Sequence, residues 1–302
     1  MRKLIFTLIA IFAALFVGDR LVGKAMWWVI QHSKDITAPK LKYLAGETDD
    51  DLIFIGTSRC NHHYVTRILE DSLGMTAYNG GINASENIYA QYSILNILLK
   101  HHTPKAIVLD LMDSYYSVQH DPFKALSFFA PYVGNNEATD SLFRLAGTYN
   151  LYMTSHVLRY NAKAVSNLAG LVYSRNSKSE KGYIPAPKPP KFPSDKRELK
   201  AGKIDSLKLK YMQKFIDKCK ESDIKLVFCI SPMYRDVAVD TYRPLYDIAR
   251  TNDIPLLDYH SAGLYLDHPE YFLDAWHLWD RGAREFSAIL AKDLKLLLGN
   301  KW

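Results

Sequence analysis

The sequence predicts an α/β protein, a three-layer sandwich in which a central parallel β-sheet is covered by helices on both faces. Two observations carry this expectation. Short runs of β-branched and other apolar residues are continuous rather than alternating, as in strands buried on both faces, and helix-like stretches lie between them. A length of 302 residues and a hydrophobic fraction of 48% allow one large domain with a substantial core.

The continuous apolar runs predict five strands, at 52–55, 75–78, 106–111, 225–230 and 255–258. Amphipathic stretches predict helices at 63–73, 84–100, 198–222, 241–252 and 281–298. Asp110, inside the third strand, is expected to be a buried, hydrogen-bonded group. Because parallel sheets bind ligands beyond the carboxyl ends of their strands, a functional site is expected in the loops that follow the strands.

Residues 1–30 predict an uncleaved signal anchor. Two basic residues precede an uncharged run of 15 residues over 4–18, and this order favours an N-terminus that stays in the cytoplasm. A run of this length also suits a cleaved signal peptide, but no small-x-small cleavage site follows it. We expect a single-pass protein of the inner (cytoplasmic) membrane whose domain, residues 31–302, is periplasmic. A cleaved signal peptide and a buried N-terminal helix are the alternatives.

The segment at about 115–195 interrupts the alternation of strands and helices. More than a hundred residues separate the third and fourth predicted strands, where one helix would be enough. Residues 115–175, rich in Tyr and Phe, predict a mostly helical insertion over the sheet edge, and the Pro- and Lys-rich stretch 176–195 predicts an extended linker. We expect the insertion to be a cap that shapes an acceptor groove, with a packed ornament as the alternative.

Charge and cysteine content exclude several classes of protein. Residues 175–220 hold 14 basic and 5 acidic side chains without a nucleic-acid-binding motif, so a solvated helix and loop is expected there, with a patch for an anionic envelope polymer as the alternative. Cys60, Cys219 and Cys229 are expected to be free thiols, with a Cys219–Cys229 bridge as the alternative. The His pairs at 62–63 and 101–102 are adjacent rather than spaced as metal ligands, so neither a metal nor another cofactor is expected.

Three short segments predict a serine-based site. Ser58 ends a Gly-Thr-Ser turn after a predicted strand, where its hydroxyl projects into the cleft; a helix cap is the alternative. Asp274 precedes His277 by three residues, close enough to orient the imidazole while its other nitrogen accepts the serine proton. The loop 79–85, NGGINAS, contains small residues that let backbone N–H groups approach a ligand.

Together these segments resemble the SGNH/GDSL hydrolase family over roughly residues 50–115 and 220–298. The family's Gly-Asp-Ser block corresponds to Gly-Thr-Ser here, which implies Ser58 as the nucleophile beside Asp274 and His277. Its Asn-x-x-Ile-x-Gly block corresponds to residues 79–84, which implies an oxyanion hole formed by the N–H groups of Ser58 and Ala84. The third block normally ends in Asn; no Asn stands there in this chain, and Ser114 is the nearest candidate donor.

The resemblance implies an SGNH-hydrolase-like, flavodoxin-like fold and a serine esterase or O-acyltransferase. With the anchor and the insertion, the chain resembles membrane-tethered members that esterify or de-esterify envelope polymers. For this chain the resemblance implies acyl esters, and acetyl esters in particular, of an envelope polysaccharide as the substrate, and a membrane acyl-transfer partner. Arg59, Asn83 and Trp276 are candidate substrate contacts, with an ordinary salt bridge (Arg59) and packing (Trp276) as alternatives. A non-catalytic carbohydrate-binding or scaffold protein of the same fold is the second hypothesis.

Overall fold

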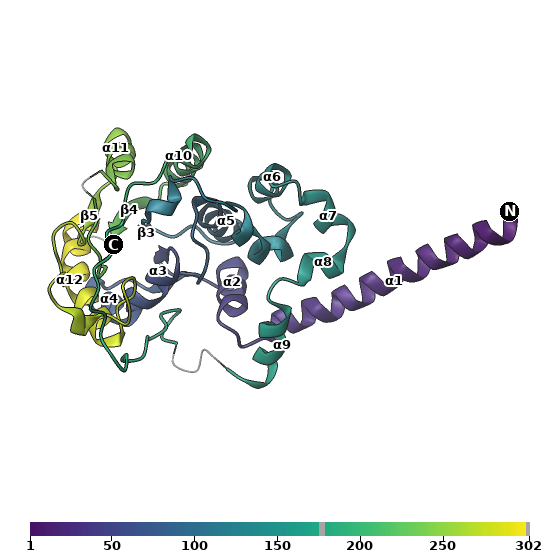
Figure 1. Ribbon diagram of the computed structural model, residues 1–302, viewed down its shortest axis with the longest axis horizontal. Coiled ribbons are helices and arrows are strands. Elements are labelled where there is room, and N and C mark those ends of the chain that lie inside the picture. Colours follow the sequence, from purple (N-terminus) through teal and green to yellow (C-terminus); the bar gives the residue numbers. More distant parts are fainter. Residues whose placement is uncertain (175–178, 239, 300–302) are drawn as a thin grey trace.

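The computed structural model describes residues 1–174, 179–238 and 240–299. A five-stranded sheet lies at its centre (Figure 1), with strand order β2-β1-β3-β4-β5 and parallel pairing throughout. The strands are β1 (Leu52–Ile55), β2 (Ala77–Asn79), β3 (Ala106–Asp110), β4 (Lys225–Ile230) and β5 (Leu256–Asp258). The predicted parallel α/β fold is confirmed, and each strand lies within two residues of its predicted position.

Helices cover both faces of the sheet and complete the three layers. Side chains alternate along the strands: Ile53 and Ile55 pack with one set of helices, while Leu52 and Phe54 pack with the other. The first set comprises α5 (Ile88–Leu99), α10 (Ser206–Glu221) and α11 (Arg243–Asn252). The second set comprises α3 (Ser58–His63), α4 (Thr66–Leu73) and α12 (Asp280–Leu298).

Polar N-caps move several helix starts away from the predicted positions. The Asp205 carboxylate accepts hydrogen bonds from the N–H groups of Leu207 and Lys208, so α10 begins at Ser206 and the predicted start at 198 is wrong. Asn87 caps α5 in the same way, so this helix begins at Ile88 and the predicted start at 84 is wrong. The helix predicted at 63–73 corresponds to α4, which begins only at Thr66, because residues 64–65 form an extended break after α3.

The insertion is mostly helical in the part of it that the structure describes, as predicted. It follows η1 (Asp113–Tyr115) and contains η2 (Lys124–Tyr132), α6 (Glu137–Leu145), α7 (Tyr149–Thr154), α8 (His156–Tyr160) and α9 (Ala164–Val172). These helices pack against α5 and against the N-terminal helix rather than over an edge of the sheet (Figure 1). Of the predicted linker, residues 176–178 lie outside the described residues. Residues 179–195 contain no helix or strand, but they pack on the domain through the buried Tyr183.

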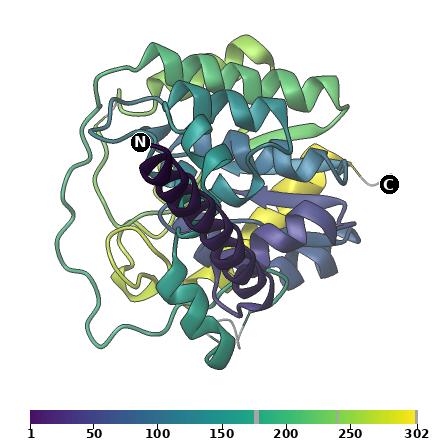
Figure 2. The ribbon, with the colours of Figure 1, turned by 90° about the vertical axis from the view of Figure 1, so that its right-hand side faces the viewer.

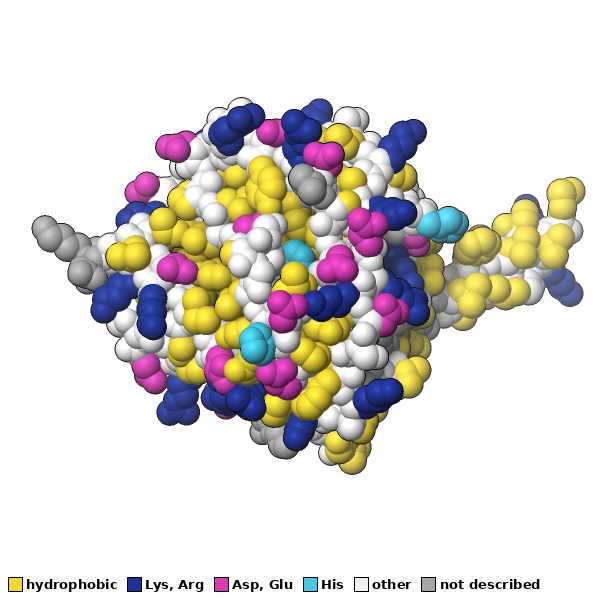
Figure 3. Space-filling model, turned by 60° about the vertical axis from the view of Figure 1, so that its left-hand side comes forward, with side chains coloured by type: hydrophobic (Ala, Val, Ile, Leu, Met, Phe, Trp, Pro, Cys, Tyr) yellow, Lys and Arg dark blue, Asp and Glu magenta, His cyan; other side chains and the backbone are white. Residues whose placement is uncertain are grey.

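The N-terminal helix α1 (Arg2–His32) is long and apolar enough to cross a membrane. Its first half projects from the domain (Figure 1), toward the viewer in Figure 2, and carries mostly hydrophobic side chains (Figure 3). No residue in its most apolar 18-residue window is buried, so the alternative of a buried N-terminal helix is wrong for that half. The second half is held by the insertion, because the Asp19 carboxylate accepts hydrogen bonds from the N–H groups of His156 and Val157 at the start of α8.

Buried polar groups and thiols match two of the sequence expectations. Cys60, Cys219 and Cys229 are buried and free, and no bridge joins the last two. Burial raises the pKa of the Cys60 thiol, which keeps it protonated and unreactive. Asp110 is fully buried and accepts a hydrogen bond from the Tyr64 hydroxyl at 2.6 Å, as the prediction for a polar residue inside an apolar strand requires.

Candidate active site

Ser58 stands at the start of α3, directly after the turn that follows β1. The turn is tight: a Cβ on Gly56 would lie 2.6 Å from the Cβ of Cys60. Thr57 is the N-cap, since its side-chain oxygen accepts the N–H of Arg59 at 3.4 Å. The cap role therefore belongs to Thr57, and the hydroxyl of Ser58 is left to reach His277, whose Nε2 lies 2.8 Å from Ser58 Oγ.

Asp274 and His277 lie in one tight loop between η3 (Pro269–Tyr271) and α12. Both carboxylate oxygens of Asp274 lie 3.0 Å from Nδ1 of His277, and one of them also accepts the N–H groups of Trp276 and His277. Burial alone would raise the pKa of Asp274, but the hydrogen bonds from His277 and from these N–H groups lower it, so the carboxylate is charged. With the Nδ1 proton held by Asp274, Nε2 is the unprotonated nitrogen and can accept the Ser58 proton.

A second histidine holds this loop in place. The N–H of Leu278 donates to Nε2 of His63 at 2.9 Å, and Nδ1 of His63 therefore carries the proton and donates to Oγ of Ser231 at 3.0 Å. His63 is fully buried, and burial lowers its pKa well below the ordinary value, so the ring is neutral. His63 thus positions the loop that carries His277, a role that no pattern in the sequence indicated.

His62 lies beside the site as well. Its ring centroid is 5.8 Å from that of His277, and its Nδ1–H donates to the carbonyl of Ile184 at 2.7 Å. Burial lowers the pKa of His62 to about 4, which keeps it neutral near pH 7. In the sequence, the only signal for either histidine was its place four or five residues after Ser58.

The candidate oxyanion donors come from two loops. In the loop after β2, Ala84 adopts a left-handed conformation with φ of 63° and is exposed, and no group in the described chain accepts its N–H. A Cβ on Gly81 would lie 2.5 Å from the N of Asn61, so this loop packs closely against α3. In the loop after β3, Ser114 is 9% exposed and its Oγ has no hydrogen-bond partner among the described residues.

Each of these loops is held by a buried lysine that the sequence analysis did not single out. Lys40, from α2 (Thr37–Gly46), donates to the Asn61 side-chain oxygen at 2.5 Å and to the Gly81 carbonyl at 2.7 Å. Lys208 donates to the carbonyls of Ser114 and Ser117 at 2.9 and 2.7 Å. Burial lowers the pKa of Lys40 to about 7 and that of Lys208 to about 8. The cost of burying both amines indicates that the loop positions matter.

The three candidate substrate contacts differ in their placement. The Arg59 side chain is 1% exposed and its Nε lies 3.3 Å from an oxygen of Asp110, as the salt-bridge alternative expects; it also lines the cavity at Ser58, so its contact with substrate stays a prediction. Asn83 is partly exposed and accepts a hydrogen bond from Asn61 at 2.8 Å. Trp276 is partly buried, and the Arg235 guanidinium lies 4.2 Å from the centroid of its ring.

A cavity of about 350 Å³ opens at Ser58, within the size range of small-molecule sites. Its lining residues belong to the segments that follow four of the strands. They are Ser58 and Arg59 after β1, Glu86 after β2, Met112, Asp113, Ser114 and the more distant Leu199 after β3, and Trp276 and His277 after β5. None of the described residues between 116 and 195 lines it, so the predicted cap over the site is wrong. Within the described residues, no cluster of His, Cys, Asp and Glu is arranged to hold a metal ion.

Comparisons with known proteins match the chain to solved structures at low identity and low TM-score. No protein-family model and no curated protein matches the chain. A Bacteroides fragilis protein described as an acylhydrolase has 14% identity over 86% of this chain and 94% of its own, with a TM-score of 0.41. A protein described as lipolytic and of the G-D-S-L family, from Desulfitobacterium hafniense, has 10% identity over 80% and 97%, with a TM-score of 0.41. An acetyl xylan esterase has 15% identity over 82% and 99%, with a TM-score of 0.41.

Proposed function

We propose that the protein is a serine esterase of the SGNH type. One observation carries the proposal: a continuous line of hydrogen bonds runs from Ser58 Oγ through the His277 ring to the Asp274 carboxylate, at 2.8 and 3.0 Å. The residues are far apart in the chain and meet beyond the carboxyl ends of the parallel strands, where such sites form. This is the arrangement that activates a serine hydroxyl for attack on a carbonyl.

In the proposed mechanism, Ser58 Oγ attacks the carbonyl carbon of an ester while its proton passes to Nε2 of His277. Asp274 stabilises the imidazolium that forms. The tetrahedral intermediate collapses when His277 returns the proton to the leaving alcohol, and an acyl group remains on Ser58. A water molecule or a second alcohol then attacks the acyl-enzyme, again with His277 as the base, and Ser58 is regenerated.

The negative oxygen of the intermediate needs donors. We assign this role to the backbone N–H groups of Ser58 and Ala84 and to the hydroxyl of Ser114. The left-handed backbone at Ala84 supports the assignment, because a non-glycine residue held there is costly and such backbone is concentrated at functional sites. The two buried lysines support it indirectly, since Lys40 and Lys208 hold the two loops from which Ala84 and Ser114 project.

The setting of the site supports a substrate class. Apart from the buried Arg59, the charged side chains that line the cavity are the acids Glu86 and Asp113, which disfavour an anionic polymer and leave a neutral acyl ester as the better fit. We propose an acetylated envelope polysaccharide, reached by a domain that α1 tethers to the cytoplasmic membrane on its extracytoplasmic side. Because no described part of the insertion covers the cavity, water has access, and we place hydrolysis ahead of acyl transfer with a membrane acyl-transfer partner.

The test uses the full-length protein purified in detergent, with p-nitrophenyl acetate and an acetylated polysaccharide as substrates. We expect Ser58→Ala to reduce kcat by at least about 10⁴-fold, since the nucleophile acts as one unit with His277 and Asp274. Ser72→Ala, an exposed serine on α4, is the matched control and should retain full activity. Unchanged activity in Ser58→Ala would refute the proposal, and a wild-type protein that binds the polysaccharide without turnover would favour the non-catalytic alternative.

A further inference from the structure

Helix α9 has its polar and apolar faces reversed. The residues it buries are Asn167 and Gly170, while Val165, Leu168 and Val172 are 83%, 54% and 94% exposed. A helix on the surface of a soluble domain ordinarily turns its apolar stripe inward. Residues 164–173 contain no charged side chain, and Tyr173 at the end of the helix is 67% exposed. The outward face of α9 is therefore suited to apolar surroundings.

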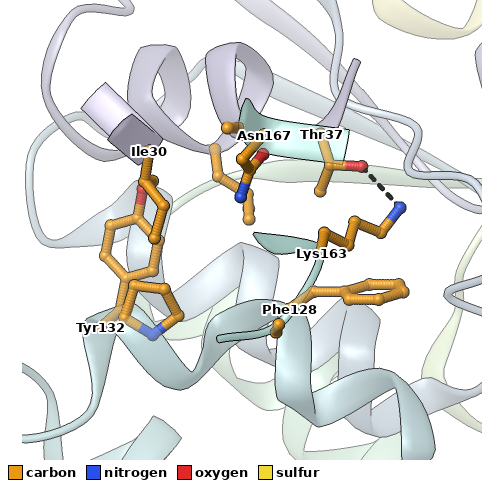
Figure 4. Close-up of a pocket in the computed structure, with 10 residues that line it drawn as sticks. Ile30, Thr37, Phe128, Tyr132, Lys163 and Asn167 are labelled. Atoms are coloured by element: carbon orange, nitrogen blue, oxygen red, sulfur yellow. Dashed lines mark hydrogen bonds between the residues drawn. The ribbon is translucent and has the colours of Figure 1, made fainter. Parts of the chain in front are cut away.

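Close contacts fix this orientation. A Cβ on Gly170 would lie 2.3 Å from the Ser33 hydroxyl oxygen, and the N–H of Lys34 donates to the Gly170 carbonyl at 2.8 Å. Asn167 is 5% exposed and faces a cavity beneath the end of α1, together with Ile30 and Thr37 (Figure 4). Rotating α9 to bury its valines would break these contacts, so the exposed apolar face is a property of the fold.

The exposed face of α9 continues the exposed face of α1. A groove of about 210 Å³ separates the two helices, lined by Val22, Ala25 and Val29 of α1 and by Ala164 and Leu168 of α9. Leu21 and Val22 are 62% and 50% exposed, so the apolar surface of α1 extends beyond Asp19 and Arg20 to the level of this groove. The insertion thus presents its apolar face beside the helix that we propose to cross the membrane.

The length of α1 indicates where the exposed face of α9 lies relative to a bilayer. The uncharged run over 4–18 spans about 22 Å as a helix, short of the hydrocarbon thickness of about 30 Å. The whole of α1, 31 residues, is about 46 Å long, close to the roughly 40–45 Å of a bilayer with its headgroups. With the centre of the run at the bilayer midplane, Val22 and Ala25, which line the groove beside α9, lie about 16–21 Å from the midplane along the helix, at the headgroup level.

We propose that α9 is a second membrane contact, an interfacial helix whose outward face lies in the boundary between headgroups and acyl chains of the bilayer that α1 crosses. Helices of this kind bury their apolar face about 5–10 Å deep, and the exposed ring of Tyr173 is of the type enriched at that level. The contact would hold the domain in one orientation on the membrane. This inference depends on the proposed anchoring by α1 but not on the proposed chemistry.

The test places an environment-sensitive fluorophore on single engineered cysteines of the full-length chain, in nanodiscs of phosphatidylethanolamine and phosphatidylglycerol that contain doxyl-labelled lipid as quencher. The native cysteines are buried, and the unsubstituted protein measures their background. Val172→Cys probes α9 and Phe12→Cys probes the exposed run of α1. Leu296→Cys on α12 is the matched control, because Leu296 is an apolar residue that is 83% exposed far from α1. We expect the labels at 12 and 172 to be quenched at least about twofold and the label at 296 to be unaffected.

The outcomes separate the two proposals. Quenching at 12 without quenching at 172 overturns the inference and leaves the anchor intact. No quenching at either position overturns the anchor and the inference with it. A label at 172 that is shielded in detergent in proportion to protein concentration, and is not quenched by lipid, assigns the face to a second copy of the chain and also overturns the inference.

Discussion

Two regions of this protein depart from the ordinary distribution of side chains in opposite ways. Around the candidate site, charged side chains are buried: Lys40, Arg59 and Asp110 are all within 1% of complete burial. On α9, apolar side chains are exposed, and Val165 and Val172 are not covered by any of the described residues. The comparison is unequal in energy. A buried charge costs several kcal/mol unless it is partnered, whereas an exposed valine is common on protein surfaces and costs little.

The buried charges and the exposed apolar side chains need different kinds of explanation. The buried charges are explained within the molecule, because each has partners that hold a loop or strand end of the site. For the exposed valines, no partner among the described residues explains the exposure. The evidence for a role is that α9 buries its polar face and exposes its apolar one, and that it packs beside α1. Changing single side chains in the first region should therefore have large effects that depend on named partners.

The largest effect on stability is expected from Arg59→Met. It leaves the buried Asp110 carboxylate without its cation, and breaking a buried pair in this way lowers the free energy of unfolding by about 3–5 kcal/mol. Urea denaturation of the full-length protein in detergent measures it. Arg197→Met is the matched control, because Arg197 pairs with Asp195 on the surface and should change stability by less than about 1 kcal/mol. Equal effects of the two substitutions would contradict the burial argument, and adding Asp110→Asn to Arg59→Met should recover much of the loss.

The strands and the catalytic segments could be predicted from sequence because their signals are local. Continuous apolar runs indicated the strands, and the spacing of Asp274 and His277 was enough to predict that they hydrogen-bond. The supporting groups could not be predicted, since their partners lie far away in the chain: His63 binds the N–H of Leu278, and Lys208 binds the carbonyl of Ser114. Nothing in the basic stretch 175–220 distinguishes Lys208, which is buried, from the lysines around it.

The insertion shows the same limit in another form. Its composition predicted helices, and helices are present, but composition does not say which neighbour they contact. A cap over the site was expected from the position of the insertion in the chain. The insertion instead packs against the N-terminal helix, because Asp19 accepts a hydrogen bond from the first N–H of α8 and α1 approaches α8 closely at Gly23. A Cβ on Gly23 would lie 2.3 Å from that of His156, a contact that no pattern within either segment reveals.

A smaller effect, on catalysis alone, is expected from Ser114→Ala. If the hydroxyl donates to the oxyanion, kcat falls by about 10²–10³-fold while KM changes little, because the hydrogen bond is made only in the transition state. Ser117→Ala is the matched control: Ser117 is also buried and its carbonyl is also bound by Lys208, but it does not line the cavity. A change of only a few-fold, equal in both variants, would remove Ser114 from the oxyanion hole.

The smallest effect, and the most dependent on pH, is expected from His62→Gln. In the folded protein burial lowers the pKa of His62 to about 4, while the unfolded chain has the ordinary value of about 6.5. Between these values the unfolded state binds more protons, so the wild type loses stability as the pH falls from about 6.5 to about 4. Gln does not titrate, and its amide can still donate to the Ile184 carbonyl. At pH 8 we expect the free energy of unfolding of His62→Gln to match that of the wild type within about 1 kcal/mol. Between pH 8 and pH 4 the wild type should lose up to about 3 kcal/mol more of this free energy than the variant does.

Equilibrium unfolding of both proteins across this pH range measures the difference, with His101→Gln, an exposed histidine, as the control that should follow the wild type. Parallel curves for His62→Gln and the wild type would mean that the ring at position 62 titrates alike in the folded and unfolded states. The neutral form matters for the proposed chemistry, because the ring lies 5.8 Å from that of His277. A second positive charge at that distance would oppose the imidazolium that His277 must form when it accepts the Ser58 proton. Burial of His62 therefore links the stability of the site region to the ability of His277 to act as a base.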